Sequence, residues 1–221
     1  MSLNRVIDTA RAELGYTESP PGSNRVKYWD EYDKAWQGQP WCVTFIWWVC
    51  RHAGEASAFL GGGKTASCSI LQKWYKAQGQ TVPVEEVREG DIVLLNFHGG
   101  AEPEHCGLAV GVTRDKTYGW TDDIYTIEGN TTMAKNGAGQ DNGGMVCQKV
   151  RYAHQIVEVC RPTYAQDPPR PDYQGHWAED SIRKAIKAGI MRGYEDGSFQ
   201  PDRAVTRAEL ATILDRLGVL E

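Results

Sequence analysis

A change of hydrophobic period along the chain is the feature that most constrains its fold. Apolar residues recur at helical spacing over residues 3–14, from Trp41 or Cys42 to Ala53, and over residues 69–78. Beyond residue 90 the pattern becomes short apolar runs separated by turn residues, which is typical of strands. These strands are expected at residues 91–97, 106–113, 124–129, 145–152 and 156–161. Helices followed by a series of strands predict an α+β domain with an antiparallel sheet.

A proline-rich segment divides the chain. Residues 165–173 contain Pro168, Pro169 and Pro171 and show no apolar period, a composition that favours a stiff, extended linker. We therefore expect one domain over residues 1–164 and a small module over residues 174–221.

The module after the linker is expected to consist of two short helices around a loop. Helical patterns cover residues 176–189 and 207–217, and Thr206 stands three residues before Glu209, the spacing of a capping box. Two short helices bury little apolar surface by themselves. This all-α module should therefore pack on another body.

Charge and hydropathy argue against two classes of partner. The chain has a formal net charge of -5 and no basic cluster that would suit nucleic-acid phosphates. Its longest apolar run, from Val43 to Cys50, is far shorter than the ~20 residues that span a bilayer. Residues 1–5 lead into the first helical pattern without the apolar stretch of a secretory signal. We expect synthesis in the cytoplasm, with no membrane span and no nucleic-acid partner.

The spacing of the cysteines argues against a metal site. The chain has six, and they form no C-x-x-C pair and accompany no H-x-x-x-H pattern. We therefore expect free thiols, no bound metal and no cofactor. Most of these thiols are predicted to be small core residues.

Cys42 is the exception, because it begins the second predicted helix. It follows Pro40 and Trp41 and opens a nearly continuous apolar run, which indicates a buried helix. Unpaired backbone N–H groups and the positive end of the helix dipole favour a thiolate at such a position. Cys42 is thus a candidate nucleophile, with an inert core cysteine as the alternative.

Two histidines are candidates for the base that such a thiol needs. His105 stands at the start of a predicted strand, where an imidazole can face the end of a helix. His98 lies beside a Gly-Gly pair in a loop pattern and ranks second. A surface loop histidine is the alternative for both positions.

Glu128 and Asn130 are candidates for orienting the histidine. They stand two residues apart at the end of a predicted strand, and residues with that spacing share one face of a sheet. We therefore expect both side chains to point toward the histidine. Ordinary turn residues at a strand end are the alternative.

The first domain resembles the CHAP family of papain-like, NlpC/P60-related peptidoglycan hydrolases, which is frequent in phage endolysins and bacterial autolysins. The resemblance is carried by residues 18–28 (ESPPGSNRVKY), 39–49 (QPWCVTFIWWV), 89–93 (EGDIV) and 105–112 (HCGLAVGV). It implies a fold of N-terminal helices packed on an antiparallel sheet.

The same resemblance implies roles for the site residues. Cys42 would be the nucleophile, His105 the base, and Glu128 and Asn130 the third and fourth positions of the site. The backbone N–H of Cys42 would contribute to an oxyanion hole, with Gln39 as a weaker second donor. The acidic residues upstream of the cysteine, Asp30, Glu31 and Asp33, do not match the calcium motif of some CHAP enzymes, and no calcium is predicted.

The tail resembles an S-layer homology (SLH) repeat, a module that binds secondary cell-wall polymers. The matching residues are Tyr173, His176, Trp177, Ala178, Gly189, Gly193, Asp196–Phe199, Pro201 and Thr206–Glu209. Arg207 matches the arginine that pairs with an anionic sugar group, and Trp177 is a candidate for stacking on a sugar or for helix packing. Such repeats usually come in threes, so the single one here is expected to self-associate between chains or to dock on its own catalytic domain.

Together these resemblances predict a peptidoglycan hydrolase of a Gram-positive host, released by a holin as a phage or prophage lysin. An N-acetylmuramoyl-L-alanine amidase is the main reading, and a stem-peptide or cross-bridge endopeptidase is the alternative. A non-catalytic cell-wall-binding protein and a general cysteine protease or transglutaminase-like enzyme are the other readings.

Overall fold

The chain divides into two compact units, Met1–Gln166 and Asp167–Glu221. The computed structural model describes residues 2–113, 123–134, 139–165, 171–173, 176–194 and 198–220. Most of the predicted linker, residues 166–170, lies outside the described residues. No helix in the described part of the chain is long and apolar enough to cross a membrane.

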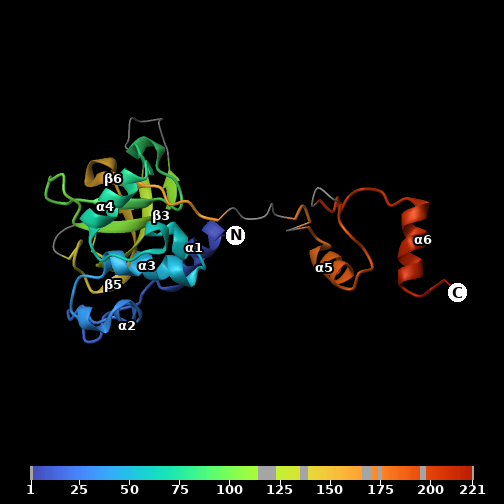
Figure 1. Cartoon of the computed structure of the whole chain (residues 1–221), viewed down its shortest axis with the longest axis horizontal. Coiled ribbons are helices and arrows are strands. Elements are labelled where there is room, and N and C mark those ends of the chain that lie inside the picture. Colours follow the sequence, from blue (N-terminus) through green and yellow to red (C-terminus); the bar gives the residue numbers. More distant parts are fainter. Residues whose placement is uncertain are drawn as a thin grey trace. The chain divides into compact units, whose positions relative to one another are not determined.

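Three of the four α-helices described in the first unit lie at the predicted places (Figure 1). The four helices are α1 (Ser2–Ala12), α2 (Lys27–Tyr32), α3 (Cys42–His52) and α4 (Cys68–Ala77). The Ser67 hydroxyl caps α4 by accepting a hydrogen bond from the Ile70 N–H, and Gly54 and Gly79 follow α3 and α4 with positive φ. Helix α2 was not predicted because its six residues are too short to show a helical period.

The strands of the first unit form one six-stranded sheet in the order β1-β6-β2-β3-β4-β5, and all its neighbours pair antiparallel. They are β1 (Thr81–Val82), β2 (Ile92–Leu95), β3 (His105–Thr113), β4 (Asp123–Thr131), β5 (Met145–Arg151) and β6 (Ile156–Cys160). Only the two-residue edge strand β1 was missed. The predicted α+β class with an antiparallel sheet is confirmed.

Helix α3 is the centre of the main core. It contacts α1 and α2 as well as β3 and β4, and nine of its eleven residues are buried. The helix approaches the sheet closely at Gly129 of β4, where an added Cβ would lie 2.6 Å from the Phe45 Cβ and 2.7 Å from the Trp41 ring. This close approach brings the start of α3 against the ends of β3 and β4.

The second unit contains two described helices, α5 (Glu179–Lys187) and α6 (Arg207–Arg216). The predicted capping box is present: the Thr206 hydroxyl accepts from the Glu209 N–H, and the Glu209 carboxylate accepts from the Thr206 N–H at 2.8 Å. No residue of α6 is buried. Apolar side chains of the unit are consequently exposed, and they include Trp177, Val205, Leu210, Leu217 and Val219.

Candidate active site

Cys42 is the first residue of α3, with Trp41 as its N-cap. No side chain caps this helix end, so its N–H groups remain oriented toward the space around the sulfur. The Trp41 ring is held in place by a hydrogen bond, because its Nε1–H donates to the buried Glu18 carboxylate at 3.0 Å. Cys42 itself is 4% exposed. The second oxyanion candidate, Gln39, is exposed.

His105 begins β3 and is fully buried beside Glu128. Its Nε2 lies 3.0 Å from Glu128 Oε2. A carboxylate only accepts hydrogen bonds, so Nε2 must carry the proton in this pair. The other ring nitrogen, Nδ1, is buried and has no hydrogen-bond partner among the described residues. It is therefore the nitrogen that is left for the Cys42 sulfur.

Arg151, at the end of β5, is the residue of this site that the sequence analysis missed. Its guanidinium is buried and donates twice to Glu128, from Nε to Oε1 at 2.7 Å and from Nη2 to Oε2 at 2.5 Å. The Thr126 hydroxyl donates to the same carboxylate at 2.6 Å. The only sequence signal for Arg151 was its alternation with Cys147 and Lys149 along β5, and this alternation does not indicate which face of the strand is buried.

A glycine lets the Glu128 side chain reach His105 across the sheet. A Cβ at Gly107 of β3 would lie 2.7 Å from Glu128 Cγ and 3.1 Å from Thr126 Cβ. Contacts this short do not occur between side chains, so the carboxylate needs the absence of a side chain at this position. Gly107 thus makes room for the Glu128 side chain in the site.

The electrostatics of the site favour an ion pair between Cys42 and His105. The pKa of Cys42 is lowered well below its ordinary value, first by hydrogen bonds with Cys106 and Cys68 and further by His105. Burial lowers the pKa of His105, but Cys42 and Glu128 raise it more, to about 9. Burial also raises the pKa of Glu128, yet Arg151 and His105 bring it down to about 2. These shifts favour the thiolate form of Cys42 and the imidazolium form of His105.

The hydrogen bonds described for Asn130 lie outside this group, and the strand alternation behind its prediction is interrupted at this position. The register of β4 and β5 shifts between Glu128 and Thr131, and Asn130 has a positive φ of 59°. Its amide group donates instead to the Asp141 carbonyl and to Asn142 Oδ1, each at 3.3 Å. Such an irregularity means that the two-residue spacing no longer shows that Glu128 and Asn130 share one face.

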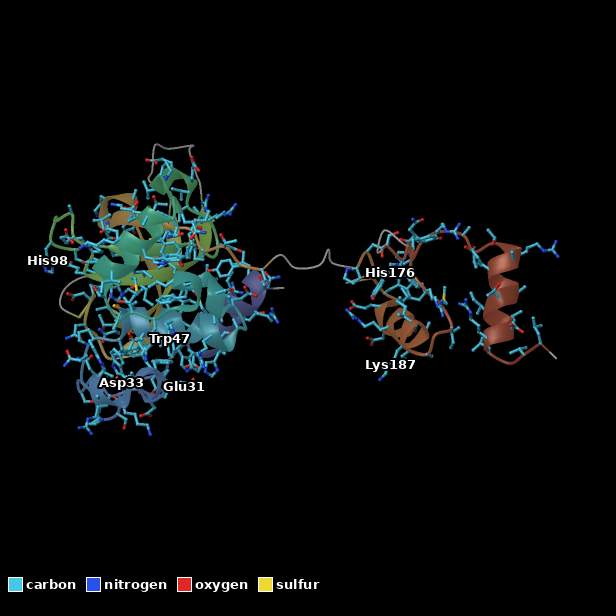
Figure 2. The ribbon with its side chains drawn as sticks, viewed as in Figure 1. Glu31, Asp33, Trp47, His98, His176 and Lys187 are labelled. Atoms are coloured by element: carbon cyan, nitrogen blue, oxygen red, sulfur yellow. The ribbon has the colours of Figure 1, made fainter. Side chains whose placement is uncertain are left out.

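The competing histidine and the upstream acidic residues have other contacts. His98 lies on an exposed loop after β2 at the periphery of the first unit (Figure 2), and its Nδ1 is 2.9 Å from Glu104. Glu31 accepts from Trp48 at 2.8 Å and pairs with His52, while the Asp33 carboxylate accepts from the Ala35 N–H. His98 thus pairs with Glu104, whereas His105 is the histidine that lies next to Glu128.

Three cysteines that are distant in the sequence meet at the start of α3. The sulfurs of Cys42, Cys68 and Cys106 all lie within 4.8 Å of one another, and all three residues are buried. All six cysteines of the chain are free thiols. Spacing patterns could not predict this cluster, because its members come from α3, α4 and β3.

The two wall-binding candidates of the tail are both exposed. Arg207 begins α6. Trp177 is 91% exposed, so it does not serve in helix packing within the described part of its unit. A separate hollow in the same unit is lined by Arg192, Tyr194, Arg203 and other residues, and Arg207 is not among them. The motif residues Asp196 and Gly197 lie outside the described residues.

Comparison with known proteins identifies the tail. Residues 171–211 match the S-layer homology domain family, so the chain carries the SLH domain that its sequence predicts. No solved structure matches the chain at a significant level.

Curated relatives match the chain over short stretches. The cell surface glycoprotein 1 of Acetivibrio thermocellus is 49% identical over 39 residues, which is 18% of this chain and 2% of that protein. The cellulosome-anchoring protein of the same organism is 42% identical over 50 residues, or 21% and 11%. The S-layer protein sap of Bacillus anthracis is 33% identical over 66 residues, or 29% and 8%. The chain thus spans at most about a tenth of the length of these relatives.

Proposed function

We propose that this protein is a cell-wall hydrolase whose first unit cleaves an amide bond of peptidoglycan with Cys42 and whose tail holds it on a wall polymer. The single observation that carries the catalytic part is the buried pair of His105 and Glu128, in which the His105 ring interacts electrostatically with Cys42 and its Nδ1 has no hydrogen-bond partner among the described residues. Wall binding has the more direct support, because the SLH family matches the tail.

The proposed reaction uses Cys42, His105 and Glu128. The Cys42 thiolate attacks the amide carbonyl carbon, and the oxyanion is stabilised by the backbone N–H of Cys42. The His105 imidazolium gives its Nδ1 proton to the departing amine, which leaves a thioester on Cys42. Neutral His105 then takes a proton from water, whose oxygen attacks the thioester and releases the new carboxylate and the Cys42 thiolate. Glu128 holds the Nε2 proton throughout and keeps the ring in place.

The bond that is cut distinguishes two versions of this proposal. An N-acetylmuramoyl-L-alanine amidase is our first choice, and an endopeptidase acting on the stem peptide or cross-bridge is the second. Digestion of purified Gram-positive peptidoglycan followed by mass analysis of the fragments separates them. New free lactyl ends on muramic acid indicate the amidase, and new amines within the peptides indicate the endopeptidase. Absence of both kinds of end would overturn the catalytic proposal.

A non-catalytic wall-binding protein is the second candidate function. The observation in its favour is the match of residues 171–211 to the S-layer homology domain family, which supports wall binding without a catalytic step. The two candidates differ in what Cys42→Ala does: a hydrolase loses its effect on walls, and a binding protein keeps it.

The tail is proposed to bind an anionic secondary polymer of a Gram-positive wall. The Arg207 guanidinium suits a carboxylate on the polymer, and the exposed Trp177 ring offers an apolar face to a sugar. We further propose that the protein is made in the cytoplasm and reaches the wall after a holin opens the membrane. Sedimentation with purified walls, before and after removal of the secondary polymer, tests the binding.

A further inference from the structure

The three-sulfur cluster contains more thiols than the proposed hydrolysis requires. Cys42 is the first residue of α3, Cys68 is the first residue of α4, and Cys106 is the second residue of β3. Their sulfurs lie within 4.8 Å of one another. The proposed hydrolysis uses one of these sulfurs as a nucleophile and assigns no bond-making step to the other two.

We propose that these three sulfurs form a binding site for Zn²⁺. Zinc bonds to thiolate sulfur at about 2.3 Å in a tetrahedral arrangement, which places ligand sulfurs roughly 3.8 Å apart. The observed spread of up to 4.8 Å therefore requires side-chain shifts of about 1 Å. Three thiolates are soft ligands, and such ligands favour zinc over calcium or magnesium.

Three protein ligands leave the fourth position of the ion for water or another external ligand. His105 is not among the residues whose ligand atoms lie within the 4.8 Å set. Its ring is held by Glu128 on the opposite side, at 3.0 Å from Nε2. The site therefore resembles an open zinc centre more than a closed structural one.

The three ligands differ slightly in exposure. Cys68 is 7% exposed and Cys42 is 4% exposed, while Cys106 is fully buried.

Zinc at this site would block the nucleophile. A sulfur lone pair that is donated to the metal is not available to attack a carbonyl carbon, so bound Zn²⁺ should act as a reversible inhibitor. This consequence rests on the proposed function, whereas binding of the ion rests on the three sulfurs alone.

The test uses the full-length reduced protein, with Zn²⁺ and Co²⁺ as probes. We expect one zinc ion per chain, and a thiolate-to-cobalt charge-transfer band when Co²⁺ replaces it. Cys68→Ala and Cys106→Ala should each weaken zinc binding at least about 100-fold, because each removes a ligand. Cys147→Ala is the matched control, since this buried thiol on β5 lies outside the cluster.

Circular dichroism verifies that each variant is folded, and Cys68→Ser replaces Cys68→Ala if the alanine variant does not fold. Failure to bind zinc at micromolar concentration, or equal affinity in the wild type and the folded Cys68 variants, would overturn the proposal. Zinc binding without any hydrolysis of peptidoglycan would support the site and count only against the proposed function. Hydrolysis that zinc does not inhibit, in a chain that binds no zinc, would count only against the site.

Discussion

Replacement of Arg151 by methionine tests the electrostatic account of the site. The guanidinium donates twice to Glu128 and is 1% exposed, so Arg151→Met leaves a buried carboxylate with His105 as its only charged partner among the described contacts. The pKa of Glu128 is lowered from 4.5 to about 2. At about 1.4 kcal/mol per pKa unit, this shift, to which Arg151 and His105 both contribute, corresponds to roughly 3.5 kcal/mol. Removal of one partner of a buried ion pair costs a similar amount, about 3–5 kcal/mol.

Urea unfolding as a function of pH measures this effect, with tryptophan fluorescence as a signal dominated by the first unit. A lowered carboxyl pKa stabilises the folded state above the pKa of the unfolded chain, and the stabilisation is lost as the pH falls from about 4.5 to 2. Arg151→Met should therefore lower the free energy of unfolding by about 3 kcal/mol at pH 7, and by less at acidic pH. Arg151→Lys keeps the charge and should lose less than Arg151→Met.

Two results would refute this reasoning. One is a loss below about 1 kcal/mol at pH 7, which is the size expected of an exposed ion pair. The other is a loss that stays constant between pH 7 and the acid range, which would place its cause outside the titration of Glu128.

Four further predictions concern the rest of the molecule. The rate of hydrolysis should fall as the pH rises through about 9, because His105 loses the proton that the leaving amine needs. A pH–rate profile checks this prediction, and a rate that stays level to pH 10 would contradict it. In thermal unfolding, Gly129→Ala should destabilise the first unit by about 1–3 kcal/mol, because the added Cβ overpacks against Phe45. Gly111→Ala is the control and should be nearly neutral, because its Cβ would lie 3.6 Å from its nearest neighbour. Arg207→Ala should weaken wall sedimentation roughly 10-fold, in line with the loss of a charge-assisted hydrogen bond, while Arg183→Ala should not. Light scattering should show self-association through the exposed apolar residues of the tail, and a strict monomer at micromolar concentration would count against it.

The order of elements could be predicted from the sequence because the hydrophobic period is a local property. The buried run of α3 and the five longer strands all follow from spacing and turn residues. The pairing of strands is not local: β6 lies between β1 and β2, and no spacing along the chain indicates that position. The short elements α2 and β1 were not predicted, because they contain too few residues to show a hydrophobic period.

The candidate site was predictable only where residues follow a motif. Cys42, His105 and Glu128 stand at motif positions, and His105 and Glu128 are in contact. Arg151 and the partners of Cys42 in the sulfur cluster depend on tertiary packing, which brings together residues that lie far apart in the chain. Asn130 was expected to follow the strand alternation, and a shift of register after Glu128 breaks it. Local rules thus fail where the backbone becomes irregular.

Hydrolysis of purified peptidoglycan by matched cysteine variants tests the central claim most directly. The assay compares the rate of fragment release by the wild type, Cys42→Ala and Cys147→Ala at neutral pH under reducing conditions. The account predicts that Cys42→Ala loses at least about three orders of magnitude in rate, while Cys147→Ala stays within about two-fold of the wild type. Equal release by the wild type and a folded Cys42→Ala variant would contradict the assignment of Cys42 as the nucleophile.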